Sequence, residues 1–157
     1  MKARRKARTV VLQALYEIDC TTHPAELVLE ERLEEQPLSP ETEDFARRLV
    51  AGVLQHAATL DKLIHTHAPE WPLDQMAIID RNILRMAMWE FAADRQTPIK
   101  VAINEAVELA KLYGSDSAPR FVNGVLGALA ARQAEIARAL TASATQTKLS
   151  PSTPSPD

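Results

Sequence analysis

Apolar residues recur at steps of three and four along most of this chain, and that spacing is the feature that most constrains its fold. The clearest stretch runs from Met76 to Phe91, where Ile79, Ile83 and Met86 continue the pattern without a break. Such a period places apolar side chains on one face of an α-helix. Only four of the 157 residues are glycine, which disfavours a turn-rich β architecture. The sequence therefore predicts an all-α protein.

Proline, glycine and capping residues divide this pattern into about seven helices. Ser39 is expected to cap the third helix, with Pro40 at its first helical position. Gly114 is expected to end the sixth helix in a left-handed conformation, and Asp116 or Ser117 to cap the last one. The helices are predicted over residues 3–20, 25–36, 40–54, 59–68, 76–91, 100–113 and 119–140.

The C-terminal part of the chain changes in composition. Gly124, Gly127 and Ala131 place small residues on neighbouring turns of the last predicted helix, which indicates that another helix axis approaches closely. Residues 141–157 are rich in Thr, Ser and Pro and poor in large apolar side chains, so they cannot repay the entropy of ordering. We therefore predict one helical domain over residues 1–140, followed by a disordered tail over 141–157.

Charge is distributed unevenly along the chain. The formal net charge is −3, from 18 cations and 21 acids. Five of the cations precede the first acid, Glu17, so residues 9–157 carry 13 cations against 21 acids. A basic N-terminus on an acidic body is typical of a polyanion site, although short cationic N-termini also serve solubility. Here the cations lie on a helix with a core-facing stripe, so they would be held rigidly against the folded body.

Most catalytic and cofactor motifs are absent. No glycine pair has the spacing of a dinucleotide fingerprint or a phosphate-binding loop, and no nucleophile elbow is present. His65 and His67 would point to opposite helix faces, so neither a metal nor another cofactor is expected. Glu105 and Glu108 are three residues apart and could form a catalytic carboxylate pair. We prefer a structural interpretation, in which Glu108 pairs with Lys111 and Glu105 is a solvated or helix-packing residue.

Other features indicate the compartment. The lone Cys20 cannot close an intramolecular disulfide, which favours a reducing cytoplasm. No run of about 18 apolar residues exists, so no membrane span is expected.

A second group of polar residues gathers where the last predicted helix begins. Arg120 supplies a cation, Phe121 an aromatic face, and Asp116, Ser117 and Asn123 supply hydrogen-bonding groups. Single-stranded RNA is recognised by such groups, because splayed bases stack on aromatic rings and pair through their edges with polar side chains. On spacing alone, Phe121 fits the core better than the surface.

Several segments together resemble the NusB family of transcription antitermination factors. Its signature is similar to residues 98–114, PIKVAINEAVELAKLYG, followed by residues 120–126, RFVNGVL. The first helix resembles the family in residues 3–8, ARRKAR, and 13–16, QALY, and the central helix in residues 80–85, DRNILR. The resemblance covers roughly residues 3–132. One departure is Ala118, followed by Pro119, where the family usually has a serine two residues before the basic residue.

The resemblance implies two small helical bundles without catalytic activity. They would bind the boxA element of ribosomal RNA leader transcripts as single strands, together with the ribosomal protein NusE. Other Nus factors and RNA polymerase would complete a larger complex that reads through terminators. Carried over by position, the RNA-binding residues are Arg4, Arg5, Lys6, Arg8, Gln13, Asp116, Ser117, Arg120 and Phe121. The partner contacts are Tyr16 and Asp80.

Two other functions fit parts of the sequence. One is an RNA-recognition domain like that attached to ribosomal RNA cytosine methyltransferases, although no Rossmann-like domain follows in this sequence. The other is a helical adaptor that binds only proteins. The sequence leaves open whether the chain is a monomer or a homodimer, since some relatives with this fold self-associate.

Overall fold

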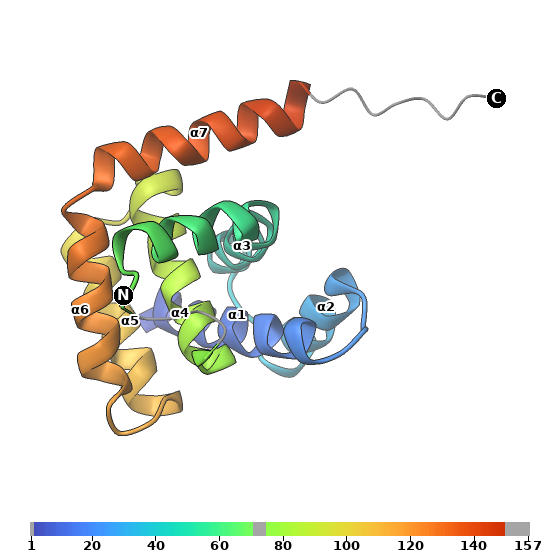
Figure 1. Cartoon of the computed structure of the whole chain (residues 1–157). Helices are drawn as coiled ribbons and strands as arrows, with labels where there is room; N and C mark the ends of the chain where they lie inside the picture. Colours follow the sequence, from blue (N-terminus) through green and yellow to red (C-terminus); the bar gives the residue numbers. More distant parts are fainter. Residues whose placement is uncertain (1, 71–74, 150–157) are drawn as a thin grey trace.

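The computed structural model describes residues 2–70 and 75–149, which form α-helices joined by short connections (Figure 1). No strand occurs within these residues, and the prediction of an all-α protein is confirmed. A π-helical segment, η2 (Trp89–Asp94), directly continues α4. The α-helices are α1 (Lys2–Cys20), α2 (Ala25–Glu35), α3 (Pro40–His67), α4 (Ile78–Met88), α5 (Ile99–Tyr113), α6 (Ala118–Ala130) and α7 (Gln133–Leu149).

The helices pack as two small bundles that share a face. In the first bundle α1 lies against α2 and α3, and in the second α4, α5 and α6 pack on one another. Contacts of α1 and α3 with α4 join the two bundles, while α7 lies across α3 and η2 (Figure 1). The predicted arrangement of about seven helices in two small subdomains is therefore observed.

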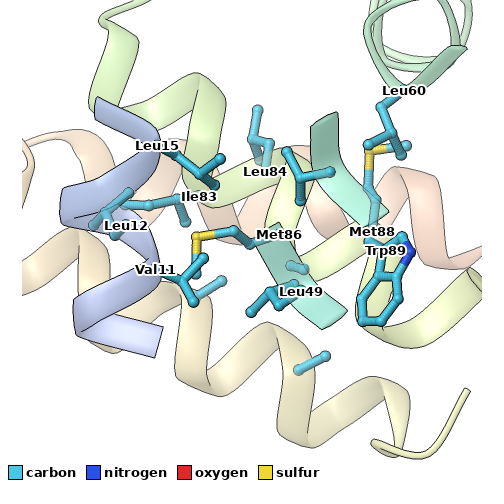
Figure 2. Close-up of a cluster of buried hydrophobic side chains, with 14 of the residues drawn as sticks. Val11, Leu12, Leu15, Leu49, Leu60, Ile83, Leu84, Met86, Met88 and Trp89 are labelled. Atoms are coloured by element: carbon cyan, nitrogen blue, oxygen red, sulfur yellow. The ribbon is translucent and has the colours of Figure 1, made fainter. Parts of the chain in front are cut away.

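The core lies where α1, α3 and α4 meet. Figure 2 shows its apolar side chains pointing toward one another from these three helices. Each is almost fully buried, as the three- and four-residue spacing predicted. Fully removing one such side chain from water contributes about 1.5–3 kcal/mol, so this cluster is the main source of stability. The labelled side chains from these helices are Val11, Leu12, Leu15, Leu49, Leu60, Ile83, Leu84, Met86 and Met88.

A polar network is buried beside this core. Arg85 is only 8% exposed, and its guanidinium donates to both carboxylate oxygens of Asp61, at 2.7 and 2.6 Å. The same guanidinium reaches Asp19 Oδ2 at 3.4 Å, and Asn82 Nδ2 donates to that oxygen at 3.0 Å. These bonds link α1, α3 and α4. They also satisfy the Arg85 guanidinium, which is tolerated in a buried position only when it is paired.

The third and fourth predicted helices are one helix. As expected, it begins at Pro40, and the Ser39 hydroxyl accepts a hydrogen bond from the Thr42 backbone N–H at 3.4 Å. It then continues without a break to His67. The prediction of a boundary near residues 54–59 was wrong because that stretch holds neither proline nor glycine, and its few apolar side chains only weaken the periodic signal.

The helix ends near residues 94 and 114 also differ from expectation. Gly114 has φ −91° and ψ 179°, so its prediction as a left-handed residue was wrong. Glycine is needed there for space, since a Cβ would lie 2.6 Å from the Ala118 Cβ. The left-handed residue is instead Arg95, with φ 60°, whose N–H donates to the Glu90 carbonyl at 2.9 Å and closes η2.

The last predicted helix is two helices. Helix α6 ends at Ala130, and α7 begins at Gln133 and continues to Leu149, inside the segment predicted to be disordered. The disordered-tail prediction was therefore wrong over 141–149, while residues 150–157 lie outside the described part. Gly124 and Gly127 are exposed, and a Cβ at either would meet nothing within 4 Å. The predicted close approach of another helix there was also wrong.

One glycine does mark a close approach, and it gives a testable prediction. A Cβ at Gly52 would overlap the Trp89 indole, which occupies the space beside this glycine of α3. We expect Gly52→Ala to lower the free energy of unfolding by about 2 kcal/mol, because a rigid ring must move. Gly127→Ala is the matched control, since it fills open space and should stabilise its helix by roughly 0.5–1 kcal/mol. Urea unfolding curves distinguish the two, and a neutral Gly52→Ala would contradict this packing.

Candidate nucleic-acid interface

The N-terminal cations of α1 occupy unlike environments. The Arg4 guanidinium lies over the Phe45 ring of α3, 4.5 Å from the ring centroid, and the residue is half-buried. Lys6 is exposed and makes no ion pair with any residue that the structure describes. Stacking on an aromatic face holds a guanidinium in place while its edge stays available for hydrogen bonds. Arg4 and Lys6 are therefore the cations of this cluster that can meet a phosphate most directly.

Arg5 is oriented by a carboxylate from α5. Its Nε and Nη2 atoms donate to the two oxygens of Glu105, each at 3.0 Å. The Glu105 side chain is only 5% exposed, whereas that of Arg5 is 54% exposed. The hydrogen bonds to Glu105 raise the pKa of Arg5 above its usual range. Of the roles considered for Glu105, the structure selects packing between helices, and the outer edge of Arg5 stays open to solvent.

Arg8 is a core residue. It is 3% exposed, and its Nε and Nη2 atoms donate to the two oxygens of Glu90, at 2.8 and 2.7 Å. The Thr97 hydroxyl donates to the same carboxylate at 3.0 Å. Arg8 also lies 5.3 Å from the Phe45 ring centroid, on the ring that Arg4 contacts. This geometry leaves Arg8 no surface for RNA, and the expected direct contact does not fit the structure.

Sequence reasoning missed the residues that support this cluster. Phe45, Glu90, Thr97 and Glu105 hold the basic side chains of α1 from other parts of the fold. A signal existed for Glu90, because it is the one acid within the apolar run that follows Arg85. A lone acid in a buried helix face indicates a buried cationic partner.

Gln13 and Tyr16 lie farther along α1. The Gln13 carbonyl oxygen accepts a hydrogen bond from the Gln36 amide at 2.9 Å, which ties α1 to the end of α2. Tyr16 is 44% exposed, and a hydrogen bond to Cys20 raises the pKa of its hydroxyl. An exposed aromatic ring of this kind suits contact with another protein.

The second polar group lines a groove of about 700 Å³ at the start of α6. Ser117, Arg120 and half-buried Phe121 lie along it, and Gly124 leaves its floor open. Exposed Asp116 is adjacent in sequence. The predicted side-chain cap is absent, because the Ser117 hydroxyl makes no capping bond and lies 3.5 Å from that of Ser115.

The departure at Ala118 has a structural explanation. Ala118 is 1% exposed and packs beside Gly114, so it contributes a buried apolar methyl group to the wall of the groove and no hydroxyl. Pro119 follows in the first turn of α6, where a missing N–H costs little. Hydroxyls are still supplied to the groove by Ser115 and Ser117. The substitution therefore moves the serine hydroxyl by one position and retains the groove.

Asp80 belongs to the same groove. Its side chain comes from the first turn of α4, and the residue is 7% exposed. The Oδ1 atom accepts no hydrogen bond from the residues that the structure describes, and burial raises the pKa of the carboxyl group. A buried acceptor without a donor is costly, so a donor brought by a bound molecule would be favoured here. The structure thus places Asp80, expected to contact a protein partner, in the same groove as Arg120 and Phe121, which are expected to contact RNA.

The structure also places the remaining polar residues that the sequence singled out, within the residues it describes. Lys111 Nζ donates to Glu108 Oε1 at 3.1 Å, as predicted. His67 Nε2 lies 2.9 Å from Glu135 Oε2 on α7, and no three His, Cys, Asp or Glu side chains in this part of the chain gather as metal ligands. None of the described helices is long and apolar enough to cross a membrane.

Comparison with known proteins decides the family. The family model described as NusB family matches residues 5–131. The chain belongs to the NusB family. A transcription antitermination protein NusB from Roseiflexus castenholzii is 52% identical over 134 residues, covering 84% of this chain and 94% of the relative. The NusB of Bacillus subtilis is 45% identical over 123 residues, covering 78% of this chain and 91% of the relative.

Solved structures of NusB proteins have the same fold. The structure of T. maritima NusB matches with a TM-score of 0.73 and 34% identity over 86% of this chain and 90% of that one. A structure described as antitermination factors NusB and NusE in complex with dsRNA matches with a TM-score of 0.74 and 26% identity, over 88% of this chain and 98% of that chain. This NusB-family chain is accordingly an antitermination factor and not an enzyme.

The share of each relative that this chain covers distinguishes a NusB protein from the RNA-recognition domain of a larger methyltransferase. These two relatives are covered over more than nine tenths of their own length, so the similarity extends over nearly the whole of each NusB protein. Helix α7 begins at Gln133, beyond the residues that the family model matches. Helix α7 therefore lies outside the part of the chain that the family model matches.

Proposed function

We propose that this chain binds single-stranded boxA-type RNA of ribosomal RNA leader transcripts together with the ribosomal protein NusE. The observation that carries the proposal is the fold shared with a NusB protein described in complex with NusE and dsRNA, and the choice of a single strand rests on the groove at α6 described below. In this proposal the chain joins other Nus factors on RNA polymerase, and helps the polymerase read through terminators in the cytoplasm. The residues that would perform this lie in two places, the start of α1 and the groove at α6.

The basic end of α1 would hold the RNA backbone. Arg4 stacked on Phe45, exposed Lys6 and Arg5 oriented by Glu105 present three cationic groups along one helix. Prior orientation reduces the side-chain entropy lost when a phosphate is bound. Arg8 contributes indirectly in this proposal, because its ion pair with Glu90 fixes α1 against η2.

The groove at α6 would hold unpaired bases. The half-buried ring of Phe121 offers a stacking face, and Arg120 attracts the adjacent phosphate. Asp116 and Ser117 can bond to base edges there. On α1, apart from this groove, the amide protons of Gln13 can do the same. Bases within a duplex cannot reach such a ring, so a single strand is the form of RNA that fits the groove.

Contact with NusE would use the surface near Asp80. Tyr16 is exposed, and Leu112 and Tyr113 at the end of α5 are 68% and 41% exposed. The end of α5 lies beside Asp80, since a Cβ at Gly114 would lie 3.1 Å from the Asp80 Oδ1 atom. Exposed aromatic and aliphatic side chains next to an unsatisfied carboxylate suit a protein that brings a cation or a hydrogen-bond donor.

The proposal predicts a binding order among RNAs. A boxA-like single strand should bind more tightly than a scrambled strand or a duplex of the same length, and addition of NusE should increase that difference by about tenfold or more. Fluorescence anisotropy at fixed salt measures all these affinities. Sedimentation of the free chain decides whether it is a monomer or a homodimer before RNA is added.

Three outcomes would overturn the proposal. Equal affinity for boxA and scrambled RNA would remove the sequence preference. Tighter binding of the duplex would remove the single-strand assignment. Absence of any RNA affinity in the presence of NusE would leave the helical adaptor that binds only proteins.

A further inference from the structure

Helix α7 is fixed firmly to the body of the protein. Ile136 and Leu140 are at most 2% exposed where the helix lies over α3 and η2. The Gln133 amide donates to the Phe91 carbonyl at 2.9 Å, and the Thr59 hydroxyl donates to that of Ser143 at 3.0 Å. Figure 1 shows α7 extending across the molecule above α3. The side chains on its outer face are therefore presented in fixed positions.

Two arginines that lack an ion pair among the described residues flank a groove beside α7, Arg95 at the end of η2 and Arg138 on α7. Arg95 and Arg138 line a groove of about 550 Å³ whose other walls are Gln133, Thr141 and three alanines. None of these described lining residues carries a carboxylate. Neither arginine forms an ion pair with any described residue, which is also true of Arg4, Arg81, Arg120 and Arg132, whereas Arg5, Arg8, Arg32, Arg47, Arg48 and Arg85 do. Two guanidinium groups without an ion pair, beside small uncharged side chains, can bind phosphate groups. A phosphate accepts two parallel N–H···O hydrogen bonds from one guanidinium.

Arg95 holds its place at a conformational cost. Its φ of 60° is uncommon for a residue with a Cβ, and asparagine or glycine would adopt it more readily. The π-helical turn η2 ends at this residue, and π-helical turns frequently occur at functional sites. An arginine kept at such a position favours a role for its side chain.

Two further grooves lie between the groove on α7 and the basic start of α1, and neighbouring grooves share a lining residue. Thr141 lines both the α7 groove and a second one, and Arg48 lines both the second groove and a third that also contains Arg4. Two of the acids on this path, Asp44 and Asp94, are paired with Arg48, at 3.1 and 2.7 Å. Glu41 is the remaining acid among the described lining residues, in the first turn of α3.

We infer that the α7 groove binds the phosphate backbone of RNA that extends beyond the segment held at α1. Arg95 and Arg138 contact successive or nearby phosphates, and Arg4 and Arg48 lie along the path between the two sites. The contact is independent of base sequence in this inference, because both guanidinium groups bind phosphates, which every nucleotide carries. This inference rests on the proposed function, and it assigns to α7 a task outside the residues matched by the family model.

The test compares a short and a long RNA. We use a boxA-like strand of about 12 nucleotides and the same strand extended by about 15 nucleotides at both ends. The variant is Arg95→Asn with Arg138→Gln, since asparagine tolerates the left-handed conformation. Its affinity for the long RNA should fall roughly tenfold, and the slope of log affinity against log salt should fall by about 1.4 for two single-strand phosphate contacts. Affinity for the short RNA should not change.

The matched control is Lys62→Glu. It changes the net charge by the same amount as the double variant, on an exposed residue of α3 that lines none of the three grooves. Unchanged binding of the long RNA by the double variant would overturn the inference, as would an equal loss with Lys62→Glu or an equal loss for both RNAs. Failure of the proposed function would instead appear as a wild-type chain that does not prefer boxA RNA.

Discussion

Replacing Arg8 with methionine should lower the free energy of unfolding by about 3–5 kcal/mol. The reason is the Glu90 carboxylate, which is 2% exposed and would lose its cation and two short hydrogen bonds. An unpaired buried charge costs far more than a missing surface contact. Because a domain of this size has only about 5–15 kcal/mol of stability, the loss would be visible at once in urea unfolding followed by circular dichroism.

A second variant separates the ion pair from the loss of packing. In the double variant Arg8→Met with Glu90→Gln, the charge is removed while an acceptor for the Thr97 hydroxyl is kept. We expect it to recover most of the stability, because replacing both partners of a buried pair is often close to neutral. Equal stability loss in the single and double variants would show that Glu90 is not the cause.

Arg8 also shows how far the sequence alone could predict the site. The spacing of Ala7, Val10 and Val11 placed the core stripe of α1 correctly, and the basic cluster was correctly located on that helix. The assignment of individual cations was less accurate, because the partners of Arg5 and Arg8 come from α5 and η2. Glu105 and Glu90 are 100 and 82 residues away in sequence, and local periodicity carries no information about such contacts.

The fold was predicted where the signals were local. The Ser39 cap, Pro40 and the long apolar period of α4 each determine structure within one or two helical turns. One error, the boundary near residues 54–59, came from a weak local signal, and others concern features that depend on tertiary packing. Gly114 is needed for space beside Ala118, and α7 is helical beyond residue 140 where it rests on α3.

The groove at α6 could be predicted only in part. Sequence placed Ser117, Arg120 and Phe121 together because they are close neighbours in the chain. It could not show that Asp80 from α4 lies beside them, or that Ala118 points inward, since both depend on the approach of α4 and α5 at Gly114.

The second large effect concerns RNA binding at α1. Neutralising Arg4 and Lys6 together, as Arg4→Gln with Lys6→Gln, should weaken binding of boxA-like RNA by roughly 10- to 100-fold. These two residues are chosen because neither pairs with a buried acid among the described residues, so the fold should be unaffected. Arg5 is left unchanged, since its removal would leave Glu105 buried without a cation. Thermal unfolding of the variant should show only a small loss of about 0.5–1 kcal/mol, from the lost contact of Arg4 with the Phe45 ring.

The most direct test of the account is the salt dependence of RNA affinity for this variant, measured beside wild type and Lys62→Glu. We predict that the slope of log affinity against log salt falls by about 1.4 in the double variant, as two phosphate contacts are lost. The slope for Lys62→Glu should equal that of the wild type. An unchanged slope and affinity in the folded double variant would contradict the assignment of the RNA-binding surface to the start of α1.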